Sequence, residues 1–445
     1  MHKIALVAIS GVRVKDQELA QVGLTLPGFI ERSRVISSLP SLGLLTLAAH
    51  VPNNWECTYI EASESIDPAY TRILTDGYDV VAISSLAARI DDAYHLADRL
   101  RKNGRFVAMG GLHVTACPQE AAQHADTIIQ GEGERAIHAC LKDFENGTTR
   151  AVYNSLQTPG LRFDFKDSKV PRYDLLNLSK YNRLTIQTSR GCPLNCSFCA
   201  ASKTISTYKK KPIKHIRSEL DAILKIWPDA FIELADDNTF IDKRWSKELV
   251  QLLSEYPFKW FTESDISVAD NDSLLEALAD SGCAQVLIGF ESVNQAPLVS
   301  IDQNNWKARR WSRYIESIRK IQSFGISVNG CFILGHDGDD PSVFQKTYEF
   351  IQESGLSEVQ ITLLTPFPGT DLYHRLNRED RLFKETFWDQ CTLFDLTFHP
   401  KGMSAEQLTT GFRQLMVDLY NPEATWQRKR AFAQQRRLRN HETNR

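Results

Sequence analysis

Long apolar runs are absent from this 445-residue sequence. No stretch of about 20 consecutive apolar residues occurs, and this excludes a membrane-spanning helix. The apolar run from Ile4 to Ile9 is too short for a signal peptide, and no small-residue cleavage site follows it. We therefore expect a cytoplasmic protein.

An excess of charge of either sign is also missing. The formal net charge of −3 gives the whole chain no attraction to polyanions, so we expect no nucleic-acid partner. An apolar content of 42% and a charged content of 24% are those of a soluble globular protein, and the length predicts several domains. Only the end of the chain is strongly basic, from Arg428 to Arg430 and from Arg436 to Arg439. This pattern favours a solvated helix face or a disordered end, with contact to an anionic surface as the alternative.

Short β-type runs alternate with helical patterns through residues 1–150, and this alternation predicts an α/β fold with a doubly wound parallel sheet. The expected strands are Lys3–Ile9, Cys57–Glu61, Val80–Ser84, Phe106–Met109 and Thr127–Gln130. The expected helices are Gly43–His50, Ala87–Asn103, Pro118–His124 and Glu134–Phe144. Ligands of such sheets lie beyond the carboxyl ends of the strands.

Residues 151–183 have weaker periodicity and several prolines, and they are expected to form a linker. A second series of strands and helices fills residues 184–365 and predicts a partial β/α barrel with six strands. Its strands are Thr185–Thr188, Phe231–Ala235, Lys259–Thr262, Gln285–Gly289, Ser327–Leu334 and Val359–Leu364. Its helices are expected at 215–226, 247–255, 273–281, 311–324 and 341–354. Residues 366–445 are expected to form a helical extension with a basic tail.

The nine cysteines include a cluster of three, Cys192, Cys196 and Cys199, directly after the first strand of the second series. In a reducing compartment such a cluster indicates a metal site rather than a disulfide. Structural zinc usually takes four ligands, and no fourth cysteine lies nearby. An iron-sulfur cluster held by three thiolates keeps one iron open to a small ligand. A zinc knuckle or a structural cysteine loop remains the alternative.

The spacing Cys192-x3-Cys196-x2-Cys199, with Phe198 before the third cysteine, resembles the signature of the radical S-adenosylmethionine superfamily. The resemblance implies a 4Fe-4S cluster whose open iron binds S-adenosylmethionine. Reductive cleavage then yields a 5′-deoxyadenosyl radical, with electrons from a donor such as flavodoxin or ferredoxin. Further motifs match those by which relatives contact S-adenosylmethionine, and this implies the same contacts for Phe198, Asp236, Asp237, Glu291 and Ser292. Taken alone, Asp236 and Asp237 are more often helix caps or turn residues.

The first domain resembles that of the radical enzymes with a cobalamin-binding domain. The motifs that carry this resemblance are Pro40–Leu45, Gly110–Thr115 and Gly131–Glu134. The expected cobalamin contacts, which add two serines at a strand end, are Leu42, Gly43, Ser84, Ser85, Gly110, Gly111, His113, Gly131 and Gly133. One departure concerns the loop after the first strand, Gly11-Val12-Arg13-Val14-Lys15-Asp16-Gln17, which lacks the Asp-x-His-x-x-Gly motif of proteins that ligate cobalt with histidine. Bound cobalamin is therefore expected without a histidine on its lower face. For His113, a hydrogen-bonded structural role is the alternative.

The resemblance implies cobalamin-dependent methylation of a small-molecule or lipid substrate as the leading reaction, with methylcobalamin as the donor. Ring formation, rearrangement or another group transfer without methylation is the alternative within this family, because a fold does not determine a reaction. A non-catalytic corrinoid or zinc carrier is the alternative from another class. No catalytic side chain is assigned at this point.

Overall fold

The computed structural model describes residues 1–11, 14–19, 39–299, 301–302 and 304–443, apart from the side chains of 202–203 and 435–443. Val12 and Arg13 of the loop after the first strand therefore lie outside the described residues. So do the side chains of Arg436, Arg437 and Arg439 in the basic tail.

The amino-terminal part of the chain is built on a six-stranded parallel sheet in the order β2-β1-β3-β4-β5-β6. Residues 4–9 of β1 are all buried, as expected for a strand covered on both faces. The bounds of the strands are β1 His2–Ile9, β2 Trp55–Ala62, β3 Val80–Ser85, β4 Phe106–Gly110, β5 Thr127–Gln130 and β6 Val152–Asn154.

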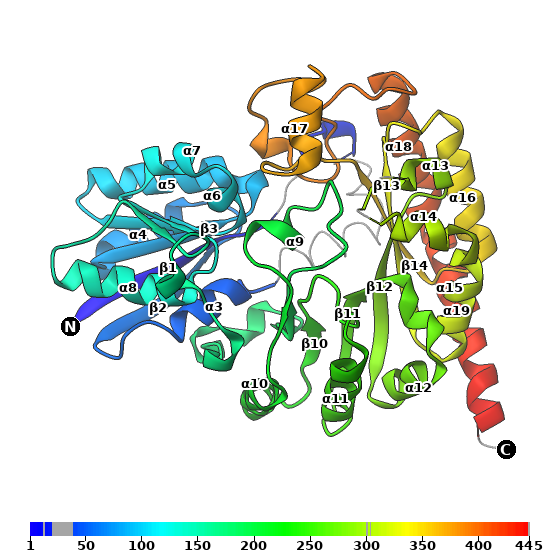
Figure 1. Ribbon diagram of the computed structural model, residues 1–445, viewed down its shortest axis with the longest axis horizontal. Coiled ribbons are helices and arrows are strands. Elements are labelled where there is room, and N and C mark those ends of the chain that lie inside the picture. Colours follow the sequence, from blue (N-terminus) through cyan, green and yellow to red (C-terminus); the bar gives the residue numbers. More distant parts are fainter. Residues whose placement is uncertain (12–13, 20–38, 300, 303, 444–445) are drawn as a thin grey trace.

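Helices cover both faces of this sheet, so the doubly wound architecture is confirmed (Figure 1). Helices α3 (Leu42–Ala48) and α8 (Glu134–Glu145) pack on one face. The other face carries α4 (Asp67–Asp76), α5 (Ile90–Lys102) and α7 (Pro118–His124). The sequence pattern did not predict α4, the short α6 (Leu112–Ala116) or β6, which lies in the segment expected as a linker. These elements are short or largely polar, so their periodicity is weak.

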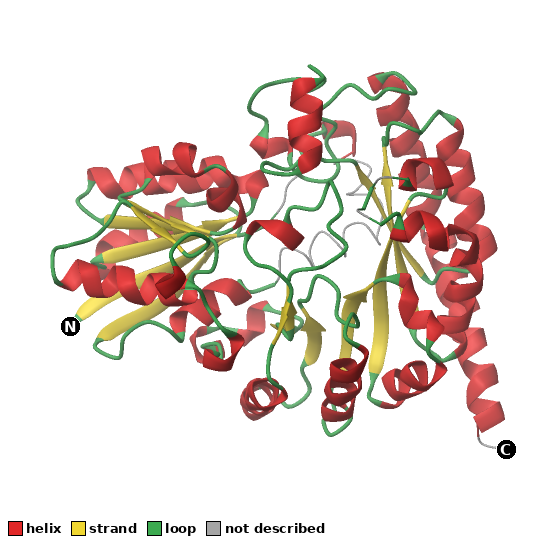
Figure 2. Cartoon of the chain, in the orientation of Figure 1, coloured by secondary structure: helices red, strands yellow, loops and turns green. Residues whose placement is uncertain are grey.

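The second sheet also has six parallel strands, and their order, β14-β13-β12-β11-β10-β7, follows the sequence. Each strand is followed by helical segments on the outer side, which gives the expected partial barrel (Figure 2). The strands are β7 Leu184–Ile186, β10 Phe231–Leu234, β11 Lys259–Ser264, β12 Cys283–Glu291, β13 Ser327–Leu334 and β14 Glu358–Leu363. The helices between them are α10 Ile213–Ile226, α11 Lys243–Leu253, α12 Asp272–Asp280, α13 Gln295–Leu298, α14 Trp306–Arg310, α15 Tyr314–Ser323 and α16 Ser342–Ser354.

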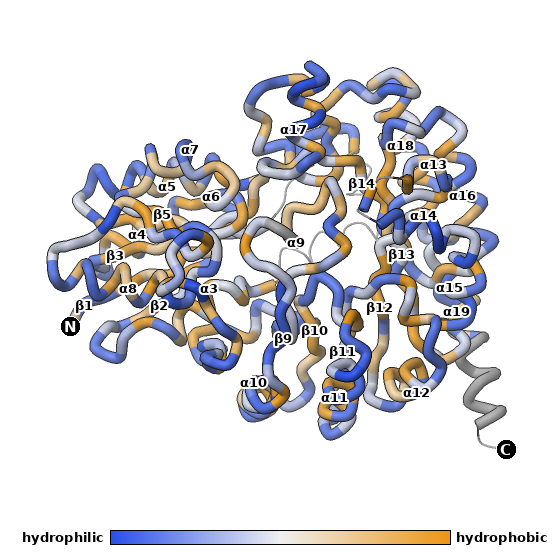
Figure 3. Tube along the Cα trace, viewed as in Figure 1, coloured by the Kyte–Doolittle hydropathy of each residue, from blue (hydrophilic) through white to orange (hydrophobic). Residues whose placement is uncertain are grey.

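Alternating burial distinguishes the two faces of the barrel strands. In β10, Ile232 and Leu234 are fully buried in the core beneath the helices, while Phe231 and Glu233 are half-buried. The same alternation appears in β11, where Trp260 is in the core and Glu263 is accessible. Figure 3 shows polar and apolar residues alternating along the surrounding helices, as expected when one helix face packs on the strands.

The carboxyl-terminal region contains α17 (Asp371–Arg378), α18 (Ala405–Tyr420) and α19 (Pro422–Thr443). Helix α18 packs its apolar side into the barrel core, whereas Phe387 and Trp388 pack into the core of the first domain. The extension therefore contacts both preceding domains. Within the part of the chain that the structure describes, no helix combines the length and apolarity needed to cross a bilayer.

Candidate active site

The three clustered cysteines lie on a loop at the carboxyl end of the first barrel strand. The loop is bounded by β8 (Ser189–Arg190) and β9 (Lys209–Lys210), which pair antiparallel. Cys196 is buried, whereas Cys192 and Cys199 are partly exposed. Two backbone hydrogen bonds tie the loop to other elements: Ser197 N donates to Ile301 O at 2.8 Å, and Leu372 N donates to Ser197 O at 2.9 Å.

The protonation of the thiols reflects this enclosure. Burial raises the pKa of Cys192 to about 11, and a charge on Cys199 adds to that effect. Burial also raises the pKa of Cys196 to about 12, with further contributions from Cys192 and Cys199. The three sulfurs thus lie close enough to influence one another. Metal coordination deprotonates thiols, and three soft thiolate ligands suit an iron-sulfur cluster.

Asp236 holds the segment that leads into the cysteine loop. Its Oδ1 accepts hydrogen bonds from Thr188 N at 2.7 Å and Ser189 N at 2.8 Å. Its Oδ2 accepts from the hydroxyls of Thr188 and Thr239. The side chain is only 2% exposed. With both oxygens taken by internal donors, Asp236 acts on the loop, and a contact to S-adenosylmethionine does not fit its surroundings.

Asp237 holds the same segment one residue later but keeps an open side. Its Oδ2 accepts a hydrogen bond from Gly191 N at 2.7 Å. Gly191 has φ +79°, and a Cβ there would lie 2.9 Å from the backbone of Thr207, so glycine is required. The carboxylate also borders a cavity, described below, and remains able to meet a ligand.

Glu291 ends strand β12 close to the cysteine loop, and Ser292 follows it. Glu291 Oε1 lies 2.9 Å from Lys307 Nζ, and both side chains are about nine-tenths buried. Burial opposes the charge of Lys307, but Glu291 and a nearby Cys196 thiolate outweigh it, so the lysine pKa is raised. Ser292 is buried and accepts a hydrogen bond from Asn294 N at 3.1 Å. Phe198 is half-buried and packs against the core.

The interior face of the barrel carries an acidic group that the sequence analysis missed. The Glu263 side chain is accessible, but the protein that surrounds it inside the barrel limits its hydration and raises its pKa to about 8; Glu233, Asp237, Asp236 and Glu291 add to this rise through repulsion. Such a concentration of carboxyl groups favours a cationic ligand. The alternation of Glu263 with buried Thr262 and Ser264 was the available signal.

A cavity of about 320 Å³ lies between the first domain and the cysteine loop. From the first domain, seven of the nine residues in the cobalamin prediction line it: Leu42, Gly43, Ser84, Gly110, Gly111, Gly131 and Gly133. From the barrel side, it is lined by Gln187, Arg190, Ala201, Ile205, Ala235 and Asp237. The described lining contains no histidine. The cavity thus joins the glycine-rich strand ends to the segment that carries the cysteines, a surface suited to a flat, largely apolar cofactor.

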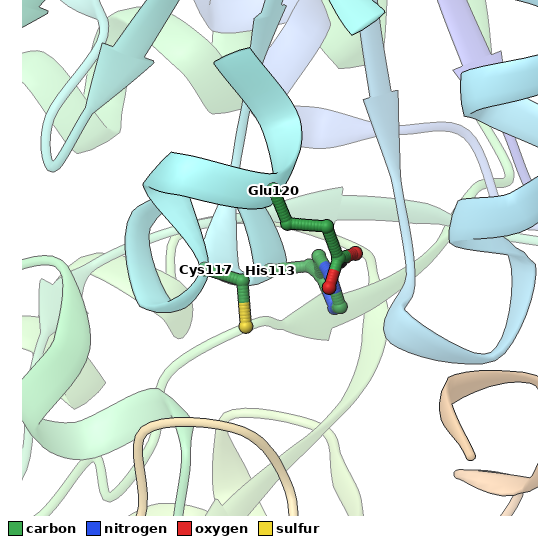
Figure 4. A group of neighbouring side chains, drawn as sticks. All are labelled: His113, Cys117 and Glu120. Carbon is green, nitrogen blue, oxygen red and sulfur yellow. Dashed lines mark hydrogen bonds and ion pairs between the residues drawn. The ribbon is translucent and has the colours of Figure 1, made fainter. Parts of the chain in front are cut away.

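Two predicted cobalamin contacts do not line the cavity. Ser85 donates its hydroxyl to Leu86 O at 2.9 Å. His113 is 2% exposed, and its Nε2 lies 3.4 Å from Glu120 Oε1 (Figure 4). The position of His113 on α6, after the turn at Gly111, directs its side chain toward α7. The side chain of His113 therefore faces Glu120 rather than the cavity.

Ligand atoms of His113, Cys117 and Glu120 lie within 4.8 Å of one another, a spacing that a metal ion tolerates. However, Trp388 Nε1 donates to Glu120 Oε2 at 2.9 Å. Burial opposes ionisation of Glu120, but hydrogen bonds from His113, Trp388 and Tyr94 lower its pKa to about 2. The carboxylate thus already has its partners. We assign this cluster to the contact between the first domain and the carboxyl-terminal extension.

Comparisons with known proteins agree with this architecture. The model of the radical SAM superfamily matches residues 186–351, that of the B12 binding domain matches residues 33–141, and a domain of unknown function, DUF4070, matches residues 370–445. The chain is 28% identical to the "uncharacterized methyltransferase sll1242" of Synechocystis, over 86% of this chain and 71% of that protein. It is 26% identical to the bacteriochlorophyllide d C-12(1)-methyltransferase of Chlorobaculum tepidum, over 88% and 84%.

A solved structure with the same fold is the radical S-adenosylmethionine methyltransferase TsrM from Kitasatospora setae, with a TM-score of 0.69 at 13% identity, covering 95% of this chain and 84% of that chain. The domain matches support a radical S-adenosylmethionine enzyme. They also support the subfamily with an amino-terminal cobalamin-binding domain, and the likeness to TsrM shows the fold. The predicted family, fold class and cofactors, namely a 4Fe-4S cluster, S-adenosylmethionine and cobalamin, are confirmed. The individual contacts stay predictions.

Proposed function

We propose that this enzyme methylates a small-molecule or lipid substrate in a cobalamin-dependent reaction. The observation that carries the proposal is the shared cavity, because the same space is bordered by the glycine-rich ends of the first sheet and by Asp237 beside the cysteine loop. Bound there, the cofactors would supply a methyl group and a radical that makes a position on the substrate reactive towards that methyl group. The relatives that act as methyltransferases support this reaction.

The side chains around the site have distinct tasks in this proposal. Cys192, Cys196 and Cys199 hold the cluster, and Asp236 fixes the backbone that presents them. The carboxyl groups around Glu263 would provide a negative environment for the cationic sulfonium of S-adenosylmethionine, and a bound cation would favour the ionised form of Glu263 itself. Glycines at 110, 111, 131 and 133 line the part of the cavity against which the corrinoid would lie.

We infer the substrate class from two of the methyltransferase relatives. One relative acts on bacteriochlorophyllide d, and another is a hopanoid C-2 methylase, 25% identical over 88% of this chain. Both of these substrates are large and mainly apolar. We therefore propose an apolar, ring-containing substrate, with an external one-electron donor such as flavodoxin or ferredoxin.

The test is anaerobic reconstitution with iron, sulfide and cobalamin, followed by turnover with S-adenosylmethionine carrying a ¹³C-methyl group. The proposal expects labelled methylcobalamin together with S-adenosylhomocysteine, and then a labelled product from tetrapyrrole or hopanoid candidates. Protein that binds its cluster and cleaves S-adenosylmethionine, but retains no cobalamin, would contradict methylation and favour ring formation or rearrangement.

A further inference from the structure

A buried arginine connects the cysteine loop to the cobalamin side of the cavity. Arg190 ends β8, two positions before Cys192. Its Nη1 lies 2.9 Å from Glu132 Oε1, and its Nη2 lies 2.7 Å from Glu134 Oε1. The side chains are 16%, 9% and 3% exposed for Arg190, Glu132 and Glu134, respectively. One guanidinium therefore pairs with both acidic residues of the turn Gly131–Glu134.

The local surroundings fix the arginine in one orientation. Its Nε and Nη2 also donate to Gln187 Oε1 at 3.0 and 2.9 Å. The guanidinium lies 4.9 Å from the ring centre of Phe165. On the far side, Lys209 pairs with Glu132 and donates to Phe163 O at 2.8 Å. A planar guanidinium held at several points keeps the groups that it joins at a fixed separation, which a mobile counter-ion would not do.

The contacts of Arg190 reach both cofactor regions. Glu132 and Glu134 flank Gly133 and line the cavity on the cobalamin side. Toward the cysteine loop, Arg190 is followed directly by Gly191, whose N donates to Asp237 Oδ2 at 2.7 Å. The two regions belong to different sheets, and the partners of the arginine are 56 and 58 residues away in sequence. Chain connectivity alone does not set their separation.

We infer that Arg190 is a positioning residue that fixes the corrinoid relative to the iron-sulfur cluster, and that it is needed for methyl transfer but not for cleavage of S-adenosylmethionine. This inference rests on the proposed function. A displacement of about 1 Å between reacting groups can cost about a hundredfold in rate. Replacement of the Arg190 guanidinium should therefore slow methyl transfer far more than radical formation.

The test compares Arg190→Gln and Arg190→Lys with wild type, and with Arg135→Gln as a matched control. Arg135 lies on the same helix as Glu134 and pairs with Asp167 at 2.6 Å, but both of these side chains are more than 40% exposed. Four quantities are measured after anaerobic reconstitution: bound iron, 5′-deoxyadenosine under dithionite, cobalamin affinity, and methylcobalamin formed from S-adenosylmethionine. In the last assay the cobalamin is first reduced to cob(I)alamin with titanium(III) citrate, so the methyl group leaves sulfur for cobalt and S-adenosylhomocysteine remains.

Arg190→Gln should retain its iron and form 5′-deoxyadenosine within about twofold of wild type, while methylcobalamin formation falls by about a hundredfold. Arg190→Lys should form methylcobalamin at a rate between those of Arg190→Gln and wild type, since lysine keeps the positive charge but not the planar guanidinium. Arg135→Gln should match wild type in every assay. Wild-type methyl transfer in Arg190→Gln overturns the inference. Loss of iron in both Arg190 variants also overturns it, because the residue would then serve the folding of the cysteine loop.

A distance-sensitive measurement separates this inference from the proposed reaction. The reduced cluster accelerates electron-spin relaxation of cob(II)alamin in a manner that falls steeply with separation. The relaxation enhancement should weaken in Arg190→Gln relative to wild type, even if no methyl transfer occurs in either. An unchanged enhancement contradicts the inference. Absent methyl transfer in wild type with a clear enhancement contradicts the proposed function alone.

Discussion

Replacement of Asp236 by alanine should release the cysteine loop. The variant leaves Thr188 N and Ser189 N, which belong to buried residues, without their acceptor. An unpaired buried polar group costs about 1–3 kcal/mol, so the two amides together cost about 2–6 kcal/mol before the structure relaxes. The variant also removes the unfavourable burial of the carboxyl group, which is what raises the pKa of Asp236, so the net loss of stability is smaller than this sum.

Two companion variants identify the cause. Asp236→Asn keeps one oxygen for the two amides, and the hydroxyls of Thr188 and Thr239 can rotate to accept from the new amide group. It should therefore behave much like wild type. Asp237→Ala loses one bond to Gly191 beside an open cavity, where water can substitute. We expect this variant to retain iron and to bind S-adenosylmethionine more weakly.

The assay is bound iron per chain after anaerobic reconstitution and gel filtration, together with thermal unfolding. Asp236→Ala should hold less than about half of the four irons expected for a 4Fe-4S cluster and should unfold at a lower temperature. Asp236→Ala with full iron and an unchanged unfolding temperature would refute the role assigned here. A variant that loses only affinity for S-adenosylmethionine would restore Asp236 as a ligand contact.

Replacing Cys192, Cys196 or Cys199 singly by alanine should abolish 5′-deoxyadenosine formation. The control Cys283→Ala, in the barrel core, should keep this activity. Product from any of the three variants would show that the cysteine replaced in it does not ligate the cluster. Because the folded pKa of Glu263 is raised to about 8, the wild type loses stability as pH rises from the unfolded value toward 8. Glu263→Gln lacks this loss, so the amount by which its unfolding temperature exceeds that of wild type should grow between pH 5 and pH 8.5. A difference that does not change with pH would refute the raised pKa of Glu263. Glu276→Gln, on an exposed helix face, serves as the control. Electron paramagnetic resonance of bound cob(II)alamin should show no nitrogen triplet from protein, since His113 faces Glu120 and not the cavity, and a triplet would contradict this view.

Much of the fold follows from local pattern. The strands that form both sheets are short buried runs bounded by turns, and β13 was predicted with its observed bounds of Ser327–Leu334. Helix α4 was missed because only Ala69 and Ile73 of its ten residues are fully buried, which leaves little periodic signal. Strand β6 has only three residues, too few for alternation to be visible.

The site was predictable where spacing carries the chemistry and not where the fold does. The three cysteines are defined by their separation along one loop, so their grouping is a local property. Asp236 and Asp237 were found as a pair, but the direction of each side chain depends on the turn that follows β10. Arg190 could not be connected to Glu132 and Glu134 from sequence, because the contact joins two sheets.

The central claim is that one cavity brings a corrinoid next to the cluster. Its most direct test is turnover of the reconstituted wild type, with cobalamin and ¹³C-methyl S-adenosylmethionine, analysed for methylcobalamin and 5′-deoxyadenosine. The account predicts labelled methylcobalamin bound to the protein, with S-adenosylhomocysteine, and 5′-deoxyadenosine under reducing conditions. Protein with a complete cluster that forms 5′-deoxyadenosine yet binds no cobalamin would contradict it.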